Sequence, residues 1–338
     1  MDRDMNGVDG RHSSVSPARR VDAWSSRHLA DYGVVAPMIP VREESVIQTK
    51  PGASKSDVSI VQTDDVSAVR VRHDIQSVGV TVLRPGRIAL ILFKPSSNNC
   101  RINGAEASVS TLYLPFKGES FHIVGASRDV IGVVLHRRKF AKTLAALQGI
   151  GVEDLALPEL MLQLNADVSS GTRKRLNAIF DLQCKENAEA GGLLDAEHFD
   201  RMVFGLLADT LMSGLSKLYE RAPPPSRPNA IVRKAEERFM AADGTPVSLA
   251  DLCLAAGVGK SVLYEAFHAI CGEPPLSYFY KRRLNSARSA LLSSPHVRGA
   301  VTRAAMDSGF TELGRFSVEY RALFGELPSV TLRSSSAE

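Results

Sequence analysis

The sequence predicts an α+β protein, with strands in the first part of the chain and helices alone in the last third. Three observations support this expectation. Short runs of β-branched residues alternate with turn residues between about Val58 and Leu135. After Phe140 the apolar residues follow helical spacing instead. From Ser248 onward, a pattern of helix, glycine turn and helix occurs twice.

Length and composition set the class of protein. With 338 residues, 44% of them hydrophobic, the chain is long enough for two domains with separate cores. A net charge of +4 and a pI near 8.9 are compatible with nucleic-acid binding without requiring it. The dispersed cysteines and histidines form no CxxC, HxH or HExxH pair, so no cofactor or metal site is expected. No run has the roughly 18 apolar residues of a membrane span. We therefore expect a soluble protein of the reducing cytoplasm.

The N-terminal part divides into a leader and a strand-rich domain. Residues 1–25 are rich in Asp, Arg, Ser and Gly without periodicity, and we expect them to be a disordered leader. The following domain is expected over residues 26–220. Its clearest strands are predicted at 67–72, 79–83, 88–93 and 130–135. The Asn103-Gly104 turn is a strong hairpin signal, and the regular spacing favours an antiparallel sandwich or barrel over βαβ units.

The end of this domain is predicted to be helical. Apolar residues at helical spacing are densest from Phe199 to Leu218. The wide apolar face of this stretch is formed by Phe199, Met202, Val203, Leu206, Leu207 and Leu211. Such a face either packs on the strands of its own chain or pairs two chains in a homodimer. One stripe can serve both purposes, so both alternatives stay open.

Residues 221–229 are predicted to separate two domains. They contain four prolines, which oppose a helix and favour an extended polyproline conformation. This composition indicates a semi-rigid linker. Residues 230–338 then form the helical domain.

The first helix-turn-helix pattern begins at Ser248, which with Asp251 is close to a capping box, and its first helix ends at Gly257. The second helix repeats apolar residues on one face, at Leu263, Ala266, Phe267 and Ile270. Its opposite face carries Lys260, Ser261, Tyr264, Glu265 and His268. In a major groove, Ser261, Tyr264 and Glu265 would lie nearest the base edges, and the other two would reach phosphates. Glu265 would be favourable only by accepting from a cytosine amino group.

The second pattern follows a long helix predicted over residues 278–292, and Gly309 makes its turn. The inward face of its second helix is formed by Phe316, Tyr320, Leu323 and Phe324. Its outward face carries Leu313, Gly314, Arg315, Ser317, Val318 and Arg321. Small and apolar groups there suit contact with thymine methyl groups. Two recognition helices in one compact unit indicate a protein that binds double-stranded DNA.

Four motifs of this domain are specific enough to identify a family. They are Leu263-Tyr264-x-x-Phe267, Pro275-Leu276-x-Tyr278, Arg283-Leu284-x-x-Ala287-Arg288 and Gly309-Phe310-x-x-x-Gly314-Arg315-Phe316-x-x-x-Tyr320-Arg321-x-x-Phe324-Gly325-Glu326-x-Pro328-Ser329. Through them, residues from about 230 to 333 resemble the DNA-binding domain of the AraC/XylS transcriptional regulators. The resemblance implies a seven-helix domain whose two recognition helices enter successive major grooves. Gly259 and Glu265 depart from the family pattern, where serine and a basic or polar residue are usual.

Residues 55–220 resemble, more loosely, the cupin-like N-terminal domains of the same family. The similarity rests on Arg101-Ile102-Asn103-Gly104, on Tyr113-Leu114-Pro115, and on the passage from strand to helix at 136–140. It implies a cupin-like antiparallel β-barrel with flanking helices that binds an effector and dimerises. No metal-binding cupin signature is present, so the expected occupant of the barrel is an organic molecule or nothing.

These expectations combine into a regulator of transcription, in this family usually an activator. Its expected partners are promoter or operator DNA, a second copy of the chain, a small organic effector and RNA polymerase. One alternative is a regulator controlled by a partner protein, with no small-molecule ligand. Another is a cupin-type enzyme fused to a DNA-binding domain. The enzyme would need a metal triad or a nucleophile with its base, and the sequence contains neither, so no catalytic residue is assigned.

Overall fold

The computed structural model describes residues 22–26, 41–54, 56–94, 99–115, 120–155, 160–188, 196–215, 227–295 and 297–334. The strands are β1 (Asp22–Ser26), β2 (Val41–Gln48), β3 (Ser56–Gln62), β4 (Val66–His73), β5 (Ser77–Leu83), β6 (Arg87–Phe93), β7 (Cys100–Ile102), β8 (Ala105–Ala107), β9 (Thr111–Leu114), β10 (Ser120–Gly125), β11 (Arg128–His136) and β12 (Leu160–Gln163). The helices are α1 (Arg137–Gln148), α2 (Ala166–Ala188), α3 (Ala196–Leu215), α4 (Arg227–Met240), α5 (Leu249–Ala256), α6 (Lys260–Cys271), α7 (Pro275–Leu292), α8 (Ala300–Asp307), α9 (Leu313–Phe324) and α10 (Pro328–Ser334). Among these helices, none combines the length and the apolar character that crossing a membrane requires.

The strands form two antiparallel sheets, as the regular spacing of strands and turns predicts. One sheet has the order β1-β3-β4-β11-β6-β9-β12, and the other has the order β2-β5-β10-β7-β8. The closed barrel is a wrong prediction in this respect, because no described strand pairs from one sheet to the other. Each outermost strand is hydrogen-bonded on one side only, whereas a barrel has no edge strands.

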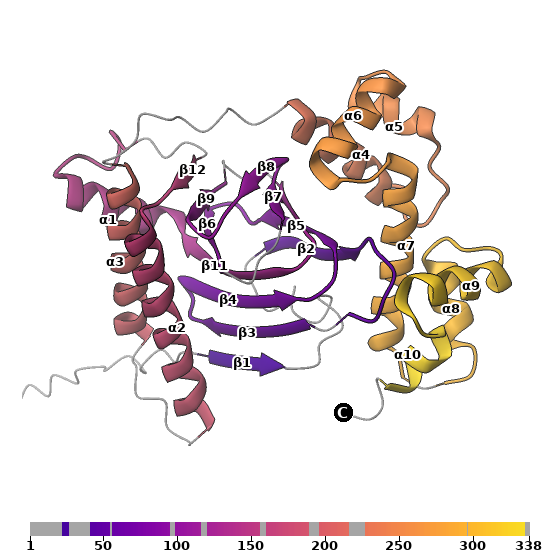
Figure 1. Ribbon diagram of the computed structural model, residues 1–338, viewed down its shortest axis with the longest axis horizontal. Coiled ribbons are helices and arrows are strands. Elements are labelled where there is room, and N and C mark those ends of the chain that lie inside the picture. The colour runs from indigo at the N-terminus through magenta and orange to yellow at the C-terminus, as the bar shows by residue number, and fades with distance from the viewer. Residues whose placement is uncertain are drawn as a thin grey trace, which may run out of the picture.

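Strand alternation gives the seven-stranded sheet two apolar faces. On β11, Val130 and Val134 belong to the core between the sheets, while Ile131 and Val133 face helices α1, α2 and α3. Figure 1 shows these helices on one side of the sheets and the C-terminal helices on the other. The domain is therefore built in layers, with strands in the middle.

Two predicted boundaries need correction. Residues 22–25 of the expected leader belong to β1, which pairs with β3 from Asp22 opposite Gln62 to Ser26 opposite Val58. The backbone groups at the edge of β3 hydrogen-bond to residues 22–26 and make them a strand. This pairing does not depend on an apolar pattern in the leader, so the sequence of the leader does not predict it. Helix α4 begins at Arg227, so residues 227–229 of the expected linker are helical. Proline is tolerated in the first turn of a helix, where its missing N–H has no intrahelical acceptor. Residues 1–21 and 216–226 lie outside the described part of the chain.

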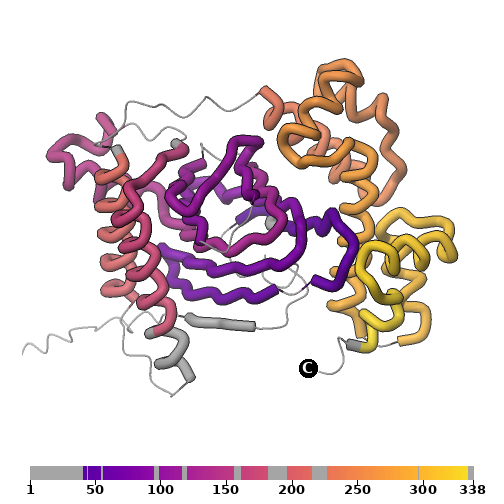
Figure 2. The backbone as a smooth tube through the Cα atoms, in the orientation of Figure 1, coloured from indigo at the N-terminus to yellow at the C-terminus, as the bar shows by residue number. Residues whose placement is uncertain are grey.

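The C-terminal domain contains seven helices, α4 to α10, within residues 227–334. Ser248 caps α5 in a capping box with Asp251, as the sequence predicts. The long helix α7 joins two small cores, one around α4, α5 and α6 and one around α8, α9 and α10. The tube in Figure 2 shows how α7 leads from the first group of helices to the second.

The first of these cores is shared between the two domains. It includes four aliphatic side chains on the outer face of the five-stranded sheet, namely Ile47, Val78, Val80 and Val124. They pack with side chains of α4, α6 and α7, such as Val232, Phe267 and Tyr278. The sheets and the C-terminal helices are thus joined by a continuous apolar contact.

Candidate nucleic-acid interface

Helix α6 has the two faces that the sequence predicts. Leu263, Ala266, Phe267 and Ile270 are buried at 0–2% exposure. Gly257 makes the turn before α6 in the left-handed conformation, with φ of +66°, and Gly259 caps α6 without a side-chain hydrogen bond. Because glycine adopts positive φ without steric cost, it suits this sharp reversal.

The predicted contact residues of α6 lie on its solvent side. Lys260, Ser261, Glu265 and His268 are exposed, and Tyr264 is half-buried. The Lys260 ammonium lies 5.8 Å from the centre of the Tyr264 ring, a cation–π contact that keeps both groups near the start of the helix. This end of α6 therefore offers a positive charge, an aromatic ring and a hydroxyl group to a ligand.

Helix α9 repeats this arrangement. Its inward face, formed by Phe316, Tyr320, Leu323 and Phe324, is buried at 0–6% exposure. On its outer face, Leu313, Gly314, Arg315, Val318 and Arg321 are exposed, and Ser317 is half-buried. Val318 is 68% exposed, although it is an aliphatic residue in the middle of a helix. An exposed valine of this kind has no role in the fold of the single chain.

Arg315 has a partner that the sequence interpretation missed. Its Nε donates to the Glu319 carboxylate over 2.9 Å, one helical turn later. Hydrogen bonds from Tyr280 and Arg315 hold the pKa of Glu319 below its usual range. The spacing of four residues between an arginine and a glutamate is the signal that points to this pair. Glu319 is half-buried and restrains Arg315 in the free protein.

Several residues of the family motifs support the fold. Arg288 of α7 donates to Glu326 over 2.8 Å and to the Tyr320 hydroxyl over 3.3 Å, and its guanidinium lies 4.8 Å from the Phe324 ring centre. Thr331 of α10 completes the cluster with a hydrogen bond to Glu326 of 2.7 Å. These contacts fix α9 between α7 and α10, and they turn the outer face of α9 to solvent.

The sheet domain touches the C-terminal ends of both candidate recognition helices. Near α6, a Cβ built at Gly104 in the β7–β8 hairpin would lie 3.0 Å from the Ala269 carbonyl oxygen. Near α9, the Leu323 carbonyl accepts hydrogen bonds from the Gln48 side chain at 2.9 Å and from the Gly52 backbone at 3.0 Å. The outer faces near the starts of the helices remain exposed, so the sheets contact the helices away from their candidate DNA surface.

A buried polar network crosses the interface between the domains. His122 of β10 lies 3.0 Å from Glu236 of α4 and 3.1 Å from the Asn229 side chain. Arg282 of α7 pairs with Glu236 at 3.2 Å and also with Glu43 of β2. Burial alone would raise the pKa of Glu236, but His122, Arg282 and the Tyr278 hydroxyl outweigh it and hold this pKa below its ordinary value.

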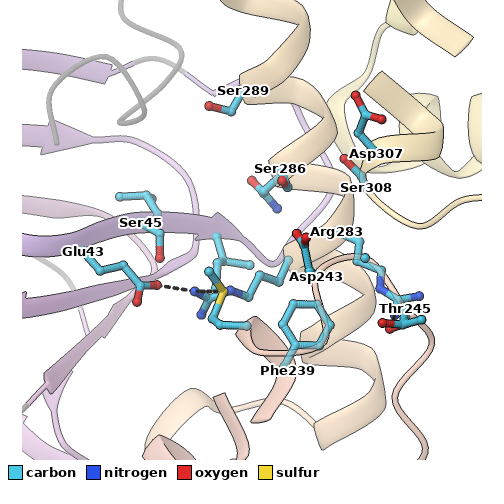
Figure 3. Close-up of a pocket in the computed structure, with 16 residues that line it drawn as sticks. Glu43, Ser45, Phe239, Asp243, Thr245, Arg283, Ser286, Ser289, Asp307 and Ser308 are labelled. Atoms are coloured by element: carbon cyan, nitrogen blue, oxygen red, sulfur yellow. Dashed lines mark hydrogen bonds and ion pairs between the residues drawn. The ribbon is translucent and has the colours of Figure 1, made fainter. Parts of the chain in front are cut away.

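A cavity of about 370 Å³ lies beside this network, between β2 and the helices α4, α7 and α8. Figure 3 shows Ser286 and Ser289 of α7 near Asp307 and Ser308, with Glu43 of β2 on the opposite side. The lining is rich in hydroxyl and charged groups, and it combines residues of both domains.

The apolar stripe of α3 is placed inside its own chain. Phe199, Val203, Leu207 and Leu211 are fully buried against the seven-stranded sheet and helices α1 and α2. Met202 and Leu206 are only half-buried. The first of the two alternatives, packing inside the chain, therefore holds for the four buried residues and for Leu206, which also packs against this core. Pairing of two chains through α3 stays a prediction, and it concerns the half-buried side of the helix.

Comparison with known proteins identifies the C-terminal part. Residues 252–334 match a family described as a helix-turn-helix domain. The chain is 34% identical over 141 residues to XylDLEGF operon transcriptional activator 2 of Pseudomonas putida, a match that covers 41% of this chain and 85% of that protein. It is also 34% identical over 144 residues to the XylDLEGF operon transcriptional activator of the same organism, of which it spans 43%. A solved structure of a probable AraC family transcriptional regulator from Rhodopseudomonas palustris is 33% identical, with 31% of this chain and 96% of that chain covered and a TM-score of 0.28. With about a third of its residues identical over most of the length of one such relative, the chain belongs to the AraC/XylS family of transcriptional regulators.

Proposed function

We propose that this protein is a sequence-specific DNA-binding activator of transcription, with α6 and α9 as its two recognition helices. The observation that carries the proposal is the same division of faces in both helices. Each buries a complete apolar stripe and leaves in solvent a face of mainly polar and charged residues, to which α9 adds the aliphatic Leu313 and Val318. A helix with this division fits a major groove, where side chains read base edges and phosphates.

The length of α7 supports binding to two successive grooves. Its 18 residues correspond to roughly 27 Å of helix, at 1.5 Å per residue. One turn of B-DNA is about 34 Å, and half-sites one turn apart lie on the same side of the duplex. A rigid connector of this length is therefore suited to hold two recognition helices near adjacent turns.

The two-sheet domain is proposed as the controlling part, of cupin-like type, which binds a small organic effector. It touches the ends of both α6 and α9, so a change in the sheets would alter their relative orientation. RNA polymerase and a second copy of the chain are the other proposed partners, and the cytoplasm is the proposed site of action. The relatives named as operon activators support activation over repression.

Footprinting of the full-length protein on DNA upstream of the genes that flank its own tests the proposal. We expect two protected segments about one helical turn apart, and a salt slope that grows by about 0.9 for each phosphate contacted. Replacing Arg315 or Arg321 with alanine should weaken binding by about 1 to 3 kcal/mol if the side chain reads a base. Lys234→Ala, an exposed lysine on α4, is the matched control. Protection of one segment only, with the α9 variants binding as tightly as the control, would refute the two-helix assignment.

A further inference from the structure

A row of polar side chains lies at one end of the apolar core between the two sheets. Arg128 of β11 is the register partner of His73 on β4, and His73 is the partner of Ser56 on β3. All three lie on the strand face that also carries Val58, Val71 and Val130 of the core between the sheets. The row is therefore part of the interior, although its members are polar.

Two of the three guanidinium nitrogens of Arg128 are buried without an acceptor among the described residues. The residue is only 4% exposed, and among the residues that the structure describes, its Nε and Nη2 atoms have no hydrogen-bond partner. Guanidinium groups stay protonated in proteins, and an uncompensated buried charge is costly. Such a group is usually paired with a carboxylate or another anion.

Two described neighbours of Arg128, His73 and Asp129, have other partners. His73 donates to or accepts from the Ser56 hydroxyl over 2.5 Å. Burial, with a smaller contribution from Arg128, lowers the pKa of His73 well below its usual value, so the imidazole is neutral. Asp129 is adjacent in sequence, but it lies on the opposite face of the strand and pairs with Lys94 at 3.0 Å.

The sequence makes room for the guanidinium. A Cβ built at Gly79 of β5 would lie 2.0 Å from Nη1 of Arg128, so any other residue at position 79 would displace the side chain. Ser77 lies on the same face of β5, two residues away, and its buried hydroxyl has no partner among the described residues. Arg128 and Ser77 together thus present donors without acceptors at one end of the interior.

We propose that Arg128 and Ser77 bind the carboxylate of a small organic acid, whose apolar body lies among the aliphatic side chains between the sheets. This inference rests on the proposed effector function of the two-sheet domain and names the chemical class of the effector. The planar fork of a guanidinium matches a carboxylate in bidentate fashion. The aliphatic surroundings favour a monocarboxylate with an apolar body over a polyanion such as a phosphate ester.

Binding of the acid at this site could be transmitted to the helices through strand β5. Gly79 and Ser77 face the acid from the inner side of β5, while Val78 and Val80 on the outer side of this strand belong to the core shared with α4, α6 and α7. A shift of β5 on binding would therefore move apolar contacts of the helical domain. This single strand connects the proposed acid to the DNA-binding surface.

Calorimetric titration of the full-length protein with acetate, hexanoate and phenylacetate at pH 7 tests the site. We expect saturable binding of hexanoate or phenylacetate, no binding of the matched amides hexanamide and phenylacetamide, and at least a tenfold loss of affinity in Arg128→Met. Arg72→Met is the matched control, because Arg72 is exposed on the opposite face of β4 and should bind as the wild type does. Ser77→Ala should lose part of the affinity.

The stability of the ligand-free variants provides a second readout. If Arg128 is an uncompensated charge waiting for an anion, Arg128→Met should melt at the same or a higher temperature than the wild type. A purely structural arginine would lower the melting temperature in the same variant. Far-UV circular dichroism confirms the fold, and Arg128→Lys keeps the charge if the methionine variant fails to fold.

Three results would overturn the site. The first is that none of the acids binds the wild type. The second is that Arg128→Met binds them with unchanged affinity. The third is that binding is lost only when Ser289→Trp fills the interdomain cavity. Footprinting of Arg128→Met separates this proposal from the proposed function. Retained DNA protection with loss of the acid response supports the site, whereas acid binding by a wild type that protects no DNA would refute the regulator and leave the acid site standing.

Discussion

His122 of strand β10 and Glu236 of helix α4 form a buried pair at 3.0 Å across the boundary between the two domains. Neither residue belongs to a proposed recognition helix or to one of the family motifs. Their side chains are 0% and 8% exposed, and both ring nitrogens of His122 find their partners on α4 of the other domain. The relationship means that the orientation of the helical domain is set by specific polar contacts, in addition to the apolar ones.

We expect Glu236→Gln to destabilise the full-length protein by about 3 kcal/mol, because removing one member of a buried charged network leaves its partners uncompensated. The control is Glu237→Gln on the same helix, whose pair with Arg233 is exposed and contributes no more than about 0.5 kcal/mol. Urea unfolding of both variants measures the difference. Equal effects would show that the network does not hold the domains together.

The pH dependence of stability should reveal the neutral His73. Its pKa is lowered in the folded protein, chiefly by burial and also by Arg128, so below about pH 6.5 the unfolded chain binds a proton that the folded chain does not. Stability is therefore present above this pH and is lost as the pH falls. In urea titrations at pH 7.5 and 5.5, His73→Gln should lose up to about 1.4 kcal/mol per pH unit of this dependence. His268→Gln, which alters an exposed histidine, should leave the slope unchanged.

Phe316 and Val318 of α9 should separate folding from recognition. Phe316 is 1% exposed and Val318 is 68% exposed. Phe316→Ala should cost about 3 to 5 kcal/mol and unfold its half of the helical domain. Val318→Ala should keep the fold, because the side chain is exposed. It should weaken DNA binding, because it removes an apolar group that could contact a thymine methyl. Circular dichroism and gel-shift titration distinguish the two outcomes, and a folded Phe316→Ala protein that fails to bind DNA would contradict the assigned faces.

Glu319 should restrain DNA binding by its pair with Arg315. In Glu319→Gln the carboxylate that holds Arg315 at 2.9 Å is lost, which removes a negative charge and frees a positive one. We expect tighter binding and a salt slope steeper by about 0.9, equal to one added phosphate contact. Glu237→Gln again serves as the control for a charge change away from the recognition helices. An unchanged slope would mean that Arg315 does not meet phosphate.

Helix α3 gives a test that distinguishes core packing from chain pairing. Leu207 is fully buried, so Leu207→Asp should unfold the sheet domain by placing a charge in the core. Met202 is half-buried, and Met202→Asp should keep the fold and give a monomer if α3 joins two chains. Sedimentation of both proteins at micromolar concentration checks this. A monomeric wild type, free and on DNA, would leave α3 with a packing role only.

The sequence predicts elements whose signal is local. The capping box at Ser248, the glycine turn at Gly257 and the two faces of α6 and α9 depend on residues a few positions apart, and the structure confirms them. The division of the strands into two sheets depends on pairing between distant segments, which periodicity does not encode. A lone histidine in a strand and a glutamate in an apolar helix face are each unremarkable in sequence, so the pair of His122 and Glu236 emerges only when the domains meet.

The core shared by the sheets and helices limits how freely either domain of this regulator can be exchanged with that of a relative. A hybrid joined within residues 221–226 would leave Ile47, Val78, Val80 and Val124 facing a helical domain that was never selected to cover them. The helices of this protein, joined to a foreign sheet domain, would in turn expose the apolar side chains that pack on β5 and β10 here. Exchange of sheet domains among relatives must therefore carry the outer face of the smaller sheet along with the core between the sheets. Because the two parts share one core, substitutions on the outer face of the sheet and on the helices that cover it must be compatible. This holds even though the sequence between the two parts has the composition of a spacer.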